Sequence, residues 1–116
     1  MYREVKIGDK KVPMLSMASC DIYYERIFNE DPLRIQVTAG DDGATAMQLF
    51  MKMGFVMAKF AELKSREKMR ELNEDDYLDW LDQFDRADYQ EALADVADVY
   101  NGQKQEKSTP KKEKDQ

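Results

Sequence analysis

The stretch ATAMQLFMKMGFVMAKFAEL, residues 44–63, decides the fold of this chain. At about 100° per residue, its polar side chains Gln48, Lys52 and Lys59 fall on one narrow stripe of a helix. Almost every other position is apolar or small. A helix that is apolar nearly all round must be covered on most sides, so the sequence predicts a long central helix with the other elements packed around it.

The helical pattern continues to Leu72, but its core-facing positions become polar after Leu63. Lys64, Glu67 and Lys68 replace the apolar residues there. We therefore expect a helix over residues 44–72 that emerges into solvent, or bends, beyond Leu63.

The N-terminal region predicts a β-hairpin. YREVKI at residues 2–7 alternates apolar and charged side chains, GDKK at residues 8–11 is typical of a turn, and VPMLSM at residues 12–17 is a second extended segment. Pro13 places the second strand at a sheet edge, because proline cannot donate a ladder hydrogen bond.

Two helices are predicted between the hairpin and the central helix. SCDIYYERIFN at residues 19–29 has helical spacing, with Ser19 as the candidate N-cap. Asp31 followed by proline predicts the capped start of a short helix over residues 33–38, although Ile35, Val37 and Thr38 also suit an extended chain. The expected fold class is mainly α (α+β), an N-terminal β-hairpin followed by a small helical domain with a long central helix.

NEDDYLDWLDQFD, residues 73–85, predicts a helix with a divided surface. Asn73 is placed to cap it. Its apolar arc holds Tyr77, Leu78, Trp80, Leu81 and Phe84, and its acidic arc holds Asp75, Asp76, Asp79 and Asp82. Asp85 is then expected to cap a last helix over residues 86–100, which stops at the Asn-Gly pair 101–102. The acids favour a solvated face over a metal or catalytic cluster.

The 116 residues allow one domain, here residues 1–102, followed by a basic tail, residues 103–116, that is expected to be disordered. The tail holds five lysines and three acids. The other 13 basic and 21 acidic residues give the domain a net charge of −8. Such a body argues against nucleic-acid binding, because phosphates would repel it.

Composition also argues against an enzyme, a cofactor or a metal site. The chain has no histidine, and without one Cys20 lacks the base that commonly activates a cysteine nucleophile. No phosphate-binding glycine loop occurs. The N-terminus lacks the apolar stretch of a signal peptide, and the apolar run 44–61 is short for a membrane span and carries two lysines. We expect a soluble cytoplasmic protein that does not contact membranes.

Methionines crowd the central helix, and two interpretations remain open. Met47, Met51, Met53 and Met57, together with Phe55, fill the core or form an adaptable partner-binding surface, since flexible thioethers suit partners of varied shape. A domain this small has difficulty covering such a helix. The second interpretation therefore includes contact with another protein or with a second copy of the chain.

Two segments resemble the tail assembly chaperones of long-tailed, siphovirus-type phages and prophages of Gram-positive bacteria. KKVPMLSMASCDIYYERIFNEDPL, residues 10–33, is similar to their N-terminal signature, and WLDQFDRADYQEALADVADVY, residues 80–100, to their C-terminal one. FVMAKFAE in the central helix is also similar. The residues that carry the likeness are Tyr24, Arg26, Phe28, Trp80, Leu81 and Phe84. The chain departs from the pattern in its ASCD stretch and in its richness in methionine.

The resemblance implies a non-virion protein of the host cytoplasm that binds the phage tape measure protein, keeps it soluble and helps tail tube subunits polymerise around it. Family members are often made in two lengths by translational frameshifting, and the basic tail fits either a short form or a plain solubilising terminus. Two alternatives stay open: an acidic inhibitor that mimics nucleic acid, suggested by the −8 domain, and a structural head–tail joining protein.

Overall fold

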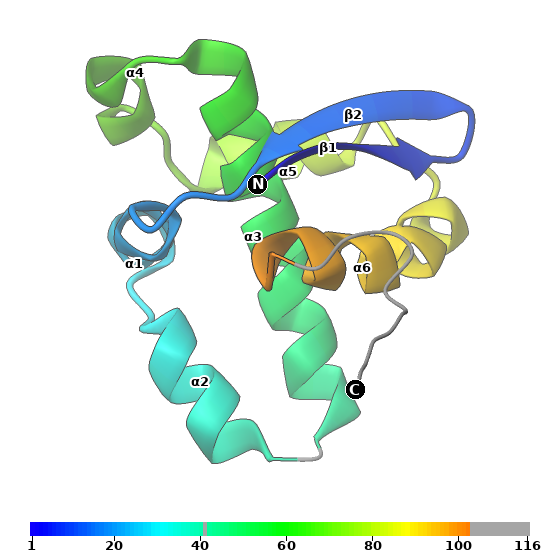
Figure 1. Ribbon diagram of the computed structural model, residues 1–116, viewed down its shortest axis with the longest axis horizontal. Coiled ribbons are helices and arrows are strands. Elements are labelled where there is room, and N and C mark those ends of the chain that lie inside the picture. The colour runs from blue at the N-terminus through cyan, green and yellow to red at the C-terminus, as the bar shows by residue number, and fades with distance from the viewer. Residues whose placement is uncertain (41, 103–116) are drawn as a thin grey trace, which may run out of the picture.

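The computed structural model describes residues 1–40 and 42–102, which form a hairpin followed by a group of helices (Figure 1). The strands are β1 (Tyr2–Ile7) and β2 (Lys10–Leu15). The helices are α1 (Cys20–Phe28), α2 (Pro32–Ala39), α3 (Gly43–Leu63), α4 (Arg66–Arg70), α5 (Glu74–Leu81) and α6 (Arg86–Tyr100). This confirms the predicted mainly α fold with an N-terminal hairpin and a long central helix. The predicted basic tail lies outside the described residues.

The hairpin is antiparallel, and its turn is tighter than the sequence suggested. Val5 pairs with Val12 and Ile7 with Lys10, which leaves only Gly8 and Asp9 in the turn. Gly8 has a φ of +64°, the left-handed conformation that a two-residue hairpin loop requires and that glycine adopts without strain. The inward face of the hairpin buries Val5, Ile7 and Met14.

Helix α3 is the centre of the domain, as its all-round apolar pattern predicted. β2, α6, α1 and α2 all pack against it, and β1 packs against α6 (Figure 1). Met53, Phe55, Val56 and Met57 of α3 are completely buried. The hydrophobic core is therefore built around this helix, with buried side chains of the hairpin, α1 and α6 packed against it.

The central helix ends at Leu63, where the sequence predicted that a helix over residues 44–72 would emerge into solvent or bend; the structure instead has two separate helices there. Lys64 adopts a left-handed conformation with φ of +52° and ends the helix, its N–H donating to the Phe60 carbonyl oxygen. The chain then restarts as the short helix α4, capped by the Ser65 side chain. Met69 returns to the core there. The loss of apolar pattern after Leu63 thus marks a break between two helices.

Most predicted helix caps are present. The Asp31 carboxylate accepts hydrogen bonds from the backbone N–H groups of Leu33 and Arg34. Asn73 and Asp76 form a reciprocal capping box at 3.1 and 3.0 Å. These contacts satisfy N–H groups that have no partner within their own helices.

Two predicted caps differ from expectation. Asp85 occupies the N-cap position of α6, but among the described residues its side chain forms no capping hydrogen bond. Ser19 likewise precedes α1 without a side-chain cap, because its own backbone is already helical, with φ of −73° and ψ of −10°. The sequence therefore predicted where both helices begin, but not whether the side chain at each start would form a capping hydrogen bond.

The two ends of the domain are held together by polar contacts. Arg3 of β1 forms a 3.1 Å ion pair with Asp95 of α6. The Ser16 hydroxyl donates to the Tyr100 carbonyl oxygen at 3.2 Å, and the Tyr100 hydroxyl donates to Asp21 at 2.6 Å. Helix α6 therefore closes the domain against the hairpin and the start of α1.

Candidate functional site

The two segments that carry the family resemblance meet at Phe55 of α3. The ring centroid of Phe28 in α1 lies 6.3 Å from that of Phe55, and the ring of Trp80 in α5 lies 5.8 Å from it, both edge to face. Tyr24 packs on Phe28 at 5.1 Å. Such aromatic pairs add to the stability that burial itself provides. These signature residues attach α1 and α5 to the central helix.

The remaining signature residues lie nearer the surface. Leu81 and Phe84 are half-buried at the end of α5 and in the turn that follows it, and Arg26 is exposed. Leu78, which the helical wheel placed on the apolar arc, is 54% exposed. That prediction is wrong because α5 packs on α3 through Tyr77 and Trp80, which leaves Leu78 on the outer side.

The methionine-rich surface predicted on the central helix is mostly absent. Met53, Phe55 and Met57 are 0% exposed, so in this fold they cannot contact a partner. They face β2, α6 and the aromatic cluster, and they fill the core. For these three residues the interpretation as a binding surface is wrong, because the hairpin and the last helix cover more of the central helix than a small domain was expected to cover.

Met47 and Met51, by contrast, reach the surface. Met47 is 41% exposed, and both side chains line a cavity of about 410 Å³ between the first half of α3 and the turn from α5 to α6. We call this cavity the Met47 groove. Its lining residues are Ala44, Met47, Gln48, Met51, Leu81, Phe84, Asp85, Arg86, Tyr89 and Gln90. It brings Met47, which is exposed, and Met51, which is half-buried, beside the signature residues Leu81 and Phe84.

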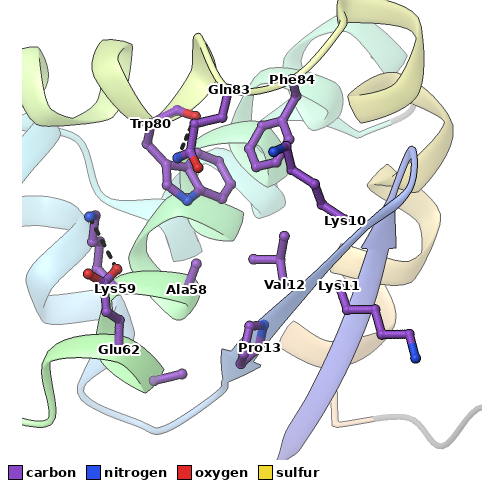
Figure 2. Close-up of a pocket in the computed structure, with 11 residues that line it drawn as sticks. Lys10, Lys11, Val12, Pro13, Ala58, Lys59, Glu62, Trp80, Gln83 and Phe84 are labelled. Atoms are coloured by element: carbon purple, nitrogen blue, oxygen red, sulfur yellow. Dashed lines mark hydrogen bonds and ion pairs between the residues drawn. The ribbon is translucent and has the colours of Figure 1, made fainter.

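A second and larger cavity lies between β2 and α5. We call it the Lys10 groove, and its volume is about 630 Å³. Its lining residues are Lys10, Lys11, Val12, Pro13, Ala58, Lys59, Ala61, Glu62, Trp80, Gln83 and Phe84. Figure 2 shows Val12 facing the Trp80 ring across this space, with Lys10 extending toward Phe84. Phe84 contributes to both grooves and separates them.

The acidic residues of α5 face solvent or cap the helix. Within residues 1–40 and 42–102, no group of three or more acidic, cysteine or histidine side chains is arranged to hold a metal ion. Asp76 is engaged in the capping box, whereas Asp75, Asp79 and Asp82 are exposed. This arrangement agrees with the predicted solvated face.

The Cys20 thiol and the phenols of Tyr77 and Tyr89 lie in surroundings that keep them protonated. Cys20 is completely buried, its thiol donates to the Leu15 carbonyl oxygen at 3.5 Å, and burial raises its pKa. Burial also raises the pKa of Tyr89 well above its usual value and that of Tyr77 to about 12. These shifts disfavour the thiolate and tyrosinate forms that act as nucleophiles or bases.

Comparisons with protein-family models, with curated proteins and with solved structures found no match to this chain. None of the helices in the described part of the chain is both long and apolar enough to cross a membrane.

Sequence reasoning found part of the Met47 groove and missed the Lys10 groove entirely. The first could be approached because its methionines follow one another at helical spacing. The second combines Lys10 with Trp80 and Phe84, which are far apart along the chain. The Lys-Lys-Val-Pro run of a strand predicted to lie at an edge was the one local signal, and it gave no indication of what that strand would face.

Proposed function

We propose that this chain is a non-enzymatic binding protein, a tail assembly chaperone of a long-tailed phage or prophage that binds the tape measure protein in the host cytoplasm. Two observations support the proposal. One is the resemblance of residues 10–33 and 80–100 to that family, with the segments packed on one helix. The other, which carries the proposal, is the Met47 groove.

The Met47 groove suits an apolar helical partner. Met47 and Met51 stand near one another on α3, and Leu81 and Phe84 form the opposite side. Unbranched thioether side chains adjust to differently shaped partners, which a long helical protein with many successive binding segments would present. The exposed fraction of Met47 leaves its side chain free to make such contacts.

Co-expression with the phage's tape measure protein tests the proposal. We expect the chain to raise the soluble fraction of that protein and to co-purify with it. Met47→Glu should abolish both effects, because a charge in the groove would be desolvated by an apolar partner. Val37→Glu is the matched control, since Val37 is 81% exposed on α2 and does not line the groove.

A tape measure protein whose solubility is the same with and without this chain would refute the proposal. Helical circular dichroism of both variants confirms that the fold is retained. The gene sequence supplies a separate test of the two-length form: a slippery heptamer near its end and an overlapping downstream frame are expected if a longer product exists.

The exposed acids of α5 favour a second candidate, an inhibitor that mimics nucleic acid. Asp75, Asp79 and Asp82 lie on the solvent side of the helix and repeat a negative charge along it. This function predicts salt-sensitive competition with DNA for a basic host protein. Absence of any such competition at low ionic strength would exclude it.

A further inference from the structure

The Lys10 groove is a basic feature on an acidic domain. Lys10, Lys11 and Lys59 line it together with one acid, Glu62, whereas residues 1–102 carry a net charge of −8. Lys59 is paired with Glu62 at 3.3 Å. Within residues 1–40 and 42–102, Lys10 and Lys11 form no ion pair. Lys10 shares the inward face of β2 with Val12 and extends toward Phe84, whereas Lys11 lies on the opposite face and its side chain points away from the rings (Figure 2). An approaching carboxylate would therefore meet Lys10 inside the groove and Lys11 at its rim.

The interior of the groove is apolar and aromatic. Val12 and Ala58 face the rings of Trp80 and Phe84, whose centroids are 5.0 Å apart (Figure 2). A volume of about 630 Å³ lies within the usual range for ligand pockets and can accept a bulky side chain with its neighbours. The apolar interior of the groove thus favours binding of an apolar side chain, and the lysines favour negatively charged residues on either side of it.

The edge of β2 disfavours addition of a third strand. Met1 and Ser16 exchange two backbone hydrogen bonds of 2.8 Å, and bonded and non-bonded pairs alternate along an antiparallel ladder. The Glu4–Pro13 pair is then a non-bonded one, so the Pro13 nitrogen points to the outer edge. Because proline has no N–H to donate there, a third strand would lack one ladder hydrogen bond in the middle of this edge, which favours a ligand held by side chains.

We propose that the Lys10 groove is a second binding site, distinct from the Met47 groove, for a segment of another protein in which carboxylates flank a bulky apolar side chain. The apolar side chain inserts between Val12 and Trp80. One flanking carboxylate pairs with Lys10 inside the groove, and another pairs with Lys11 at its rim. This site does not depend on the tape measure protein being the partner at the Met47 groove.

Binding can be measured with a short fluorescein-labelled peptide that has a central phenylalanine flanked by glutamates. Fluorescence anisotropy reports binding, and the emission of Trp80, the single tryptophan of the chain, reports contact at the groove. We expect saturable binding at low ionic strength, a change in Trp80 emission, and weakening as salt is added. Replacing the phenylalanine of the peptide by serine should remove the Trp80 signal.

The decisive variant is Lys10→Glu/Lys11→Glu, which should weaken peptide binding about tenfold or more through loss and reversal of two ion pairs. Lys68→Glu/Arg70→Glu is the matched control. It makes the same change in net charge on exposed residues of α4 that do not line the groove, and it should bind like the parent. All four positions are exposed, so both variants are expected to fold.

The proposal is overturned if millimolar peptide does not bind, or if both double variants bind equally well. It is also overturned if the serine peptide binds as tightly as the phenylalanine peptide, which would show charge attraction alone. A second copy of this chain is one other candidate occupant of the groove, because exposed Leu78 on α5 is also flanked by carboxylates, those of Asp75 and Asp79. Sedimentation of the protein without peptide tests for such a dimer. A dimer that dissociates on Lys10→Glu/Lys11→Glu would make a second copy the ligand and reject a foreign segment.

Discussion

The Tyr89 hydroxyl of α6 donates a 2.6 Å hydrogen bond to the backbone carbonyl oxygen of Met51 in α3. It reaches this oxygen because Gly54, one turn later, has no side chain. A Cβ at Gly54 would overlap the Tyr89 hydroxyl and come within 3.3 Å of Val96. The glycine in the middle of a long helix is therefore the contact point between the two helices.

Gly54→Ala should destabilise the fold by about 1–3 kcal/mol, because overpacking of the contact outweighs the better helix propensity of alanine. Gly43→Ala is the matched control: nothing lies within 4 Å of its Cβ, so it should be neutral or stabilising. Urea unfolding measures both free energies. Because Tyr89→Phe removes the clashing hydroxyl, its combination with Gly54→Ala should cost less than the sum of the single changes, and strict additivity would contradict this explanation.

Trp80→Ala should cost about 3–5 kcal/mol in the free energy of unfolding, because the ring is 6% exposed and contacts Phe55, Phe84 and Tyr89. Asp79→Ala, at the exposed neighbouring position, should change it by less than about 0.5 kcal/mol. Chemical denaturation of both variants makes the comparison. A large loss at Asp79 would show that the acidic face of α5 is not simply solvated.

Met57→Ala and Met47→Ala separate the buried methionines from those at the surface. Met57 is 0% exposed, and its truncation should cost about 2–5 kcal/mol through the cavity left behind. Met47 is 41% exposed, and its truncation should cost less than about 1 kcal/mol. Similar losses at the two positions, measured by thermal or urea unfolding, would mean that the groove at Met47 is closed in solution.

Alkaline pH should destabilise the protein. Burial raises the pKa of Tyr77 from 10.0 to about 12, so the folded state holds the phenol proton more tightly than the unfolded chain does. The resulting contribution to stability is complete below pH 10 and is lost as pH rises toward about 12. Burial raises the pKa values of Tyr24, Tyr89 and Tyr100 in the same direction.

The urea midpoint measured across this pH range should fall less steeply for Tyr77→Phe than for the parent. Tyr2→Phe, at a position 59% exposed, is the control and should keep the parent's pH dependence. An unchanged slope in Tyr77→Phe would show that this phenol does not contribute.

Elements with a local periodic pattern could be predicted from the sequence. The alternation of residues 2–7 predicted a strand, and the Asp31-Pro32 pair predicted a helix start. Both patterns involve only residues close together in the sequence, and both elements are present. The end of the central helix was harder, because the left-handed residue there is Lys64 rather than the glycine or asparagine that usually takes this conformation. The fate of the methionines was not predictable either: an apolar surface on a helix is core or interface depending on what covers it, and β2 and α6 do so from distant parts of the chain.

The ion pair between Arg3 and Asp95 joins residues 92 positions apart. During synthesis on the ribosome, the hairpin emerges first, while α6, against which β1 packs, emerges last among the described elements. Val5 and Ile7 therefore remain without their full cover until nearly the whole domain has been made. We therefore expect the core to be completed only after α6 has been made, and a protein cut before α6 to yield a collapsed, aggregation-prone fragment rather than a smaller stable domain.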